Sequence, residues 1–294
     1  MSAANPAMPQ AKLPPAVDEM LRMRLRRIDA KLDAGLRGVY SDPSLFAYPQ
    51  RLLLQRFQAY SPQQEDGILV AILRVAGPGS ETFVELGLPE AGSHCAILAR
   101  ELGWAGLVVD EHEHRVERIR WIMRGDAVDL RTAPTAADAL EAVRRFVARH
   151  EQDVLAIGAP FGGAPLLRDH AELAPRVVSV PCNPLLADDV SMHVERVAAE
   201  PSPSPEDLER TEAWLGTSVA GIEAIATARG YRLVCLSTSG STAFLLRNDV
   251  AGEISALPPA RARDIVWREL ETPPPVRRAE LEARKRCGLL LRQL

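Results

Sequence analysis

The segment from Phe83 to Asp110 constrains the fold of this chain more than any other. It opens with an apolar run that predicts a strand, continues through a turn of small residues and a helix-like stretch, and ends in a second apolar run closed by Asp110. A strand, a tight loop, a helix and a strand in this order are typical of a parallel, Rossmann-like sheet. In such a sheet, amides at the helix start and a carboxylate after the second strand hold the nucleoside of a cofactor.

Four residues of this segment are the candidate cofactor-binding residues. Glu85 lies near the end of the first predicted strand, Gly87 and Gly92 bound the turn, and Asp110 closes the second strand. The glycines would permit the turn and a close approach of the ligand, and the carboxylates would accept hydrogen bonds from it. Each acid could instead cap a helix or lie on the surface, and the residue pattern leaves both interpretations open.

Strands and helices alternate over residues 60–255, and this alternation predicts an α/β fold. We expect a mostly parallel Rossmann-like sheet with helices on both faces. Tyr231–Ser237 and Thr242–Arg247, joined by a Ser-Gly-Ser turn, predict an antiparallel hairpin at the C-terminal end of this domain. The other expected strands are 82–87, 105–110, 128–131, 154–157 and 176–180, and the expected helices are 66–75, 93–103, 112–123, 135–150 and 217–230.

The segments on either side of the α/β domain are expected to contain helices and disordered stretches but no strands. Residues 1–14 are rich in Ala and Pro and predict disorder. Residues 15–59 predict a helical extension with helices over 17–36 and 48–59, and residues 256–294 predict a proline-punctuated tail that ends in a basic helix over 277–294. The 17–36 helix carries an apolar stripe at helical spacing: Val17, Leu21, Leu25, Ile28, Leu32 and Leu36. This stripe either packs on its own domain or contacts a second copy or a protein partner.

Composition excludes some classes of function. The chain has 294 residues, a net charge of −4 and 47% hydrophobic residues, so nothing global favours nucleic-acid binding. It contains no run of about 18 apolar residues, so no membrane span is expected. The N-terminus lacks a signal-peptide pattern and the four cysteines form no CxxC pair, which favours a soluble cytoplasmic protein. His112 and His114 are two residues apart and do not share a helix face, so no metal site is expected there.

Several segments, in the same order along the chain, resemble one group of methyltransferases. They are YSPQQEDGIL from Tyr60, VELG from Val84, GWAGLVVD from Gly103, PRVVSVPCN from Pro175, WLGTSVAGI from Trp214, RGYRLV from Arg229 and GSTAFLLRNDV from Gly240. Together they resemble the FkbM-like class I S-adenosylmethionine-dependent methyltransferases, which act in polysaccharide and natural-product pathways. The resemblance implies a methyltransferase-type Rossmann fold and S-adenosylmethionine as cofactor.

The chain departs from this group where its chemistry is expected. The family pattern LSIDIDGND is replaced by LAIGAPFGG from Leu155, so Gly158 and Pro160 stand where the family has carboxylates, and Pro181 replaces the glutamate of IEYN. Glycine and proline side chains can neither bind a cation nor accept a proton. The cofactor loop is altered as well, because Pro89 lacks an amide hydrogen and Ala91 adds a Cβ. The resemblance therefore implies a degenerate member of the family.

Two functions follow from these observations. The lost acids favour a non-catalytic or atypical binding or partner subunit in a biosynthetic pathway, and we give this interpretation slight precedence. The intact order of the motifs favours an active, metal-independent O-methyltransferase acting on a sugar or natural-product hydroxyl. In an active enzyme, His193 is the candidate replacement base in a loop near the altered edge, and His94, after the cofactor loop, is a second imidazole on the cofactor side.

Overall fold

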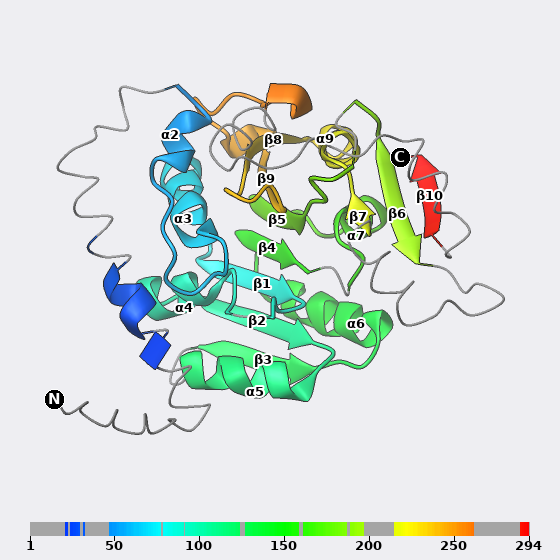
Figure 1. Ribbon diagram of the computed structural model, residues 1–294. Coiled ribbons are helices and arrows are strands. Elements are labelled where there is room, and N and C mark those ends of the chain that lie inside the picture. The colour runs from blue at the N-terminus through cyan, green and yellow to red at the C-terminus, as the bar shows by residue number, and fades with distance from the viewer. Residues whose placement is uncertain are drawn as a thin grey trace, which may run out of the picture.

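A seven-stranded sheet forms the centre of the computed structural model (Figure 1). The structure describes residues 21–22, 24–29, 32, 47–77, 79–90, 92–123, 127–158, 161–186, 189–196, 215–261 and 289–293. The strands of the large sheet are β1 (Thr82–Leu86), β2 (Ala105–Asp110), β3 (Val128–Thr132), β4 (Val154–Ile157), β5 (Val177–Pro181), β8 (Tyr231–Leu236) and β9 (Thr242–Arg247).

The strand order is β3-β2-β1-β4-β5-β9-β8. The first five strands are parallel, and β9 pairs antiparallel with both β5 and β8. The predicted α/β class, with a mostly parallel Rossmann-like sheet and a C-terminal antiparallel hairpin, is therefore confirmed. The order reverses between β1 and β4, and ligands of such sheets bind at the carboxyl ends of the strands around this reversal.

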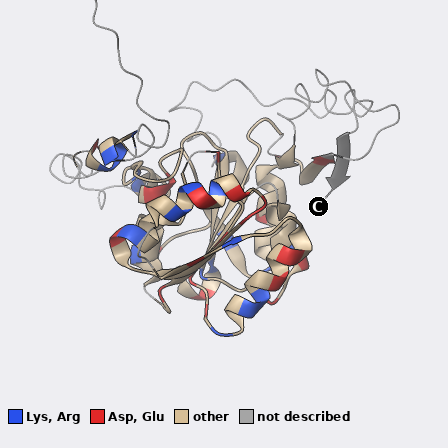
Figure 2. Ribbon diagram, turned by 90° about the horizontal axis from the view of Figure 1, so that it is seen from below, with Lys and Arg blue, Asp and Glu red and all other residues tan. Residues whose placement is uncertain are grey.

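Helices cover both faces of the sheet (Figure 1). The hydrophobic cluster on one face includes side chains of α3 (Glu65–Ala76), α4 (Ala96–Leu102) and α5 (Glu113–Ile122), and the cluster on the other face includes α6 (Ala136–Val147), α7 (Ala164–Asp169) and α9 (Val219–Ala228). Every residue of β1 and β4 is buried, as expected for central strands packed on both faces. Acidic and basic residues both occur on the outer helices, whereas the central strands are mostly uncharged (Figure 2).

The predicted helix over 48–59 is wrong in extent. Only α2 (Gln50–Leu53) is helical there. Beyond it, the backbone amides of Ala59, Tyr60 and Ser61 donate to the Asp66 side chain, so they cannot continue a helix. Gly67 lacks the Cβ that would collide with the backbone of Gln55, which allows this segment to pass directly over the start of α3.

The predicted basic helix over 277–294 is wrong at its end. Leu289–Gln293 forms a strand, β10, that pairs antiparallel with β6 (Met192–Arg196), and β6 also pairs with β7 (Gly216–Thr217). Residues 277–288 lie outside the described part. The pairing of distant segments in this second, three-stranded sheet overrides the local helical pattern of the tail.

The N-terminal extension is described only in part. Residues 21–22, 24–29 and 32 are helical, in agreement with the helix expected over 17–36, whereas residues 1–14 lie outside the described part. Arg27 forms an ion pair with Glu101 at the end of α4, at 2.5 Å. In the described portion of the chain, no helix is both long and apolar enough to span a bilayer.

Candidate functional site

Asp110 lies at the carboxyl end of β2, beneath the loop that follows β1. Its Oδ2 accepts a hydrogen bond from the Leu88 amide at 2.7 Å, and its Oδ1 accepts one from the His112 amide at 2.8 Å. The guanidinium of Arg115 on α5 is 4.0 Å from Oδ2. Asp110 is fully buried, so its carboxylate joins the β1 loop to the start of α5.

Glu85 lies in β1, and its buried side chain binds the backbone just before α4. Its carboxylate accepts hydrogen bonds from the amides of His94 at 2.8 Å and Cys95 at 3.3 Å, and from the Ser93 hydroxyl. Burial raises the pKa of Glu85, and the His94 charge and these hydrogen bonds oppose the increase. Glu85 therefore binds the two residues that precede α4, and its role toward a cofactor stays a prediction.

The backbone conformation around the loop requires glycine at positions 87 and 92. Gly87 and Gly92 have φ values of 78° and 87°, which side chains rarely tolerate. A Cβ on Gly92 would collide with the carbonyl oxygen of Tyr60. The structure thus brings all four predicted cofactor residues to one loop and the strand ends beside it.

Two arginines of α5 hold this loop closed over Asp110. Arg118 donates to the carbonyl oxygen of Pro89 at 2.9 Å and to that of Glu90. Arg115 forms an ion pair with the Glu90 carboxylate. Residues 87–90, named here the β1 loop, are therefore attached to α5 by charged hydrogen bonds, which are stronger than neutral ones.

The substituted positions lie at the same edge of the sheet. Gly158 directly follows β4 and its amide donates to Leu86 O, while Pro181 is the last residue of β5 and pairs with Thr242. A Cβ on residue 158 would be 2.6 Å from the carbonyl oxygen of Gly87, so the β1 loop occupies the space that a side chain would need. Pro160 lies outside the described residues.

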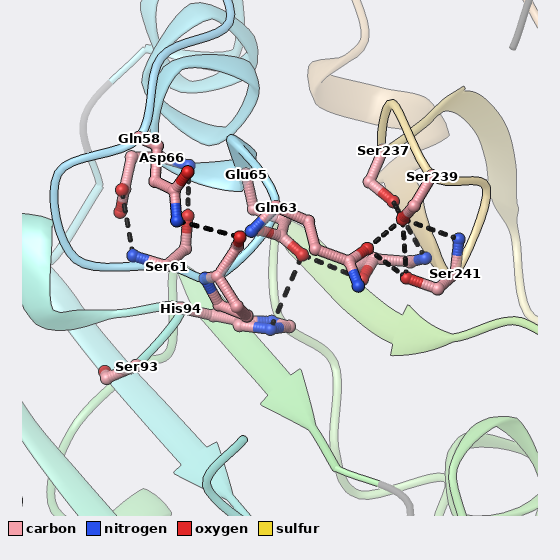
Figure 3. Close-up of polar contacts among 12 residues, drawn as sticks. Gln58, Ser61, Gln63, Glu65, Asp66, Ser93, His94, Ser237, Ser239 and Ser241 are labelled. Atoms are coloured by element: carbon pink, nitrogen blue, oxygen red, sulfur yellow. Dashed lines mark hydrogen bonds and ion pairs between the residues drawn. The ribbon is translucent and has the colours of Figure 1, made fainter. Parts of the chain in front are cut away.

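A group of polar side chains lies between the start of α3, the start of α4 and the turn between β8 and β9 (Figure 3). We call it the edge cluster: Gln63, Glu65, His94, Ser237, Ser239 and Ser241. Glu65 accepts hydrogen bonds from the Gln63 amide at 2.6 Å and from the hydroxyl of Thr242 at 3.2 Å. The Nε2 of His94 is 3.9 Å from Glu65 Oε1, and the exposed fractions of the two side chains are 18% and 2%. A carboxylate and an imidazole thus lie at the carboxyl edge of the sheet, where β4 ends before Gly158 and β5 ends at Pro181.

The serines of the edge cluster belong to the turn between β8 and β9. The hydroxyls of Ser239 and Ser241 donate to the side-chain oxygen of Gln63. The carbonyl oxygen of Ser241 accepts from the Cys182 amide at 2.7 Å, which holds the turn against the end of β5. Sequence reasoning missed Gln63 and Glu65; the acidic pair inside YSPQQEDGIL was the signal that could have indicated them.

His193 is not in a loop, as predicted, but in β6. Its Nδ1 is 2.9 Å from the hydroxyl oxygen of Thr217 on β7. Its proposed action as a base remains a prediction. His112 and His114 stack on each other at 5.4 Å at the start of α5, and the described residues contain no group of three or more His, Cys, Asp or Glu suited to hold a metal ion.

Comparisons with known proteins add little. No family model and no curated protein matches the chain. Among solved structures, it is similar to the N-terminal domain of EvdMO1 with SAH bound, at 19% identity and a TM-score of 0.39, over 64% of this chain and 80% of that one. The same domain in the presence of SAH and D-fucose gives 19% identity and a TM-score of 0.38, over 64% and 83% of the two chains. Similarity at this level assigns neither a family nor a ligand.

Proposed function

We propose that the chain binds S-adenosylmethionine at the carboxyl ends of β1 and β2 and transfers its methyl group to a hydroxyl without a metal ion. One observation carries the proposal: His94 joins the two halves of the site. Its backbone amide donates to Glu85 on the cofactor side, and its ring faces Glu65 in the edge cluster. The ordered motifs that resemble FkbM-like methyltransferases support the same assignment.

The residues present fit the cofactor, provided that the β1 loop moves. A carboxylate has about four acceptor sites, and Asp110 uses two of them for backbone amides, so it retains capacity for the two ribose hydroxyls. Because Asp110 is fully buried, the β1 loop must open before a ribose can reach it. Glu85 would keep the start of α4 in place during this movement.

Bound S-adenosylmethionine supplies an activated methyl group. His94 Nε2 would accept the proton of the attacking hydroxyl, because imidazole is the side chain that most often acts as a general base. The nearby Glu65 carboxylate would stabilise the imidazolium that forms. Glu65 and His94 thus compensate for the acids missing at Gly158 and Pro181, and for this reason we place methyl transfer ahead of the non-catalytic interpretation.

A binding or partner subunit is the second candidate function. It is favoured by the burial of Glu85 and Asp110, whose carboxylates already accept hydrogen bonds from backbone amides of the chain. The exposed apolar stripe on the N-terminal helix supports it too: Leu21, Leu25, Ile28 and Leu32 are 38%, 59%, 49% and 60% exposed.

Calorimetry with S-adenosylhomocysteine separates the two candidates. We expect heat of binding for the wild type and for Glu113→Ala, an exposed acid three residues away, but not for Asp110→Asn. Absence of heat at millimolar ligand in the wild type would favour the partner subunit.

A methyl-transfer assay then tests the role of His94. Radiolabelled S-adenosylmethionine is offered with a panel of neutral sugars and glycosides. His94→Gln should lower the rate by about 100-fold, the usual contribution of a general base, while binding of S-adenosylhomocysteine is unchanged. Equal rates in the variant and the wild type would remove His94 from the mechanism.

A further inference from the structure

The carboxylate and the imidazole of the edge cluster belong to different elements. Glu65 is the first residue of α3, whereas His94 lies just before α4, and Glu65 Oε1 is 3.9 Å from His94 Nε2. The separation of the two groups therefore depends on how the start of α3 packs against α4. A misplacement of about 1 Å at a reacting group lowers a rate by about 100-fold, so the contacts that join these two elements bear on the proposed reaction.

Tyr60 contacts both elements. Its backbone amide donates to Asp66 Oδ2 in the first turn of α3, at 2.8 Å. Its carbonyl oxygen accepts from the Ser93 amide, just before α4, at 3.1 Å. Its hydroxyl donates to Oε1 of Glu101, in the last turn of α4, at 2.8 Å. One residue thus binds the start of α3 and both ends of α4.

The contacts of Tyr60 are enclosed by the chain. Tyr60 is 4% exposed, and its carbonyl oxygen lies so close to Gly92 that any Cβ there would collide with it. Burial and the hydrogen bond to Glu101 raise the pKa of the Tyr60 hydroxyl, so it remains a proton donor at neutral pH. Arg27 Nε is 2.5 Å from the same Glu101 oxygen. The hydroxyl therefore donates to a charged acceptor, which makes a stronger hydrogen bond than a neutral one.

We infer that Tyr60 is a positioning residue, which fixes the separation of Glu65 and His94 by holding the start of α3 against α4. The inference rests on the proposed function for its effect on the rate. Removal of the hydroxyl leaves the amide and carbonyl bonds of Tyr60 in place but releases the far end of α4. The start of α4, and His94 with it, then moves more freely relative to Glu65.

Hydrogen exchange of the ligand-free protein, followed by NMR, tests the positioning. Tyr60→Phe removes only the hydroxyl, and the amides of Ser93 and His94 should exchange about tenfold faster, as expected for loss of one hydrogen bond to a charged group. Tyr231→Phe is the matched control. Tyr231 is 3% exposed and its hydroxyl donates to Pro175 O at 2.6 Å, so this variant loses a buried hydrogen bond outside the site and should leave both exchange rates unchanged.

Two variants of Glu101 separate the Tyr60 hydrogen bond from the Arg27 ion pair. Glu101→Ala removes the acceptor, so it should accelerate exchange at Ser93 and His94 as Tyr60→Phe does, and the double variant should add little. Glu101→Gln keeps an acceptor oxygen for Tyr60 but loses the ion pair, so its exchange rates should stay close to those of the wild type. Equally fast exchange in Glu101→Gln and Glu101→Ala would assign the effect to Arg27 and overturn the inference.

The methyl-transfer assay then tests the effect on the reaction. Tyr60→Phe should lower kcat about tenfold while KM and the affinity for S-adenosylhomocysteine stay unchanged, because the variant alters geometry rather than binding. A raised KM with an unchanged kcat would overturn the inference, as would wild-type exchange rates at Ser93 and His94 in Tyr60→Phe. If the wild type transfers no methyl group, faster exchange in Tyr60→Phe would still support the positioning of His94, and the proposed function alone would fail.

Discussion

Gly158 and Gly87 lie so close together that a Cβ on residue 158 would be 2.6 Å from the carbonyl oxygen of Gly87. The contact joins the end of β4 to the β1 loop that covers Asp110. A side chain at position 158 would therefore collide with the β1 loop, so introducing a carboxylate there should not by itself create an acidic site at this edge of the sheet.

We therefore expect Gly158→Asp to destabilise the protein by about 1–3 kcal/mol, the usual cost of overpacking. Gly158→Ala should have a similar effect, because the collision begins at the Cβ rather than at the carboxylate. Urea unfolding of both variants measures this. A Gly158→Asp protein as stable as the wild type would show that the β1 loop can move aside without lowering the free energy of unfolding.

The β1 loop should open more readily when Arg118 is removed. Arg118→Ala deletes hydrogen bonds to Pro89 O and Glu90 O, so the Leu88 amide bound to Asp110 should exchange its hydrogen about tenfold faster. Arg120→Ala, on the same helix but paired with Glu117, is the matched control. Hydrogen exchange followed by NMR measures the exchange rate of the Leu88 amide in both variants. Equal rates in Arg118→Ala and the wild type would show that Arg118 does not hold the β1 loop in place.

Asp66 should make stability fall as pH rises. Burial raises its pKa to about 6, against the hydrogen bonds it accepts from Ser61, Tyr60 and Ala59, so the folded state binds a proton that the unfolded state releases near pH 4. Between about pH 4 and pH 6 this group therefore reduces the free energy of unfolding, by roughly 3 kcal/mol at most. We expect the stability difference, wild type minus Asp66→Asn, to decrease over this range in urea unfolding. A difference that is constant or grows with pH would refute the raised pKa.

The exposed stripe of the N-terminal helix should mediate association. Leu25 and Ile28 are 59% and 49% exposed, so replacing both with Asp leaves the described core intact. If the stripe joins two copies, Leu25→Asp with Ile28→Asp should halve the mass measured by light scattering, whereas Asp29→Ala should not. A wild type that is monomeric at the same concentration would exclude self-association through this helix.

Much of the fold followed from local patterns. The apolar runs of β1 and β2 and the amphipathic spacing of α6, capped by Thr135, have strong periodicity that tertiary packing reinforces. The short extent of α2 and the strand β10 did not follow. The amides of Ala59 and Tyr60 bind Asp66 instead of continuing the expected helix, and β10 is made by pairing with the distant β6. The periodicity of each segment alone indicates neither partner.

The sequence predicted one part of the candidate site, the four cofactor residues, but not the other part, the edge cluster. Glu85, Gly87, Gly92 and Asp110 lie within one strand–loop–helix–strand unit, so their spacing alone places them together. The edge cluster joins α3, α4 and the β8–β9 turn, which are far apart in sequence. The meeting of Glu65 with His94 depends on the strand order, and local patterns do not give that order.

An NMR titration with S-adenosylhomocysteine tests the central claim most directly. We predict that the amide resonances of Leu88, His94 and Cys95 shift on binding, because the β1 loop must open and the start of α4 lies beside the ligand. Resonances at the amino ends of β4 and β5 should stay unchanged. Shifts confined to that opposite edge, or no shifts at saturating ligand, would contradict a cofactor site at the carboxyl ends of β1 and β2.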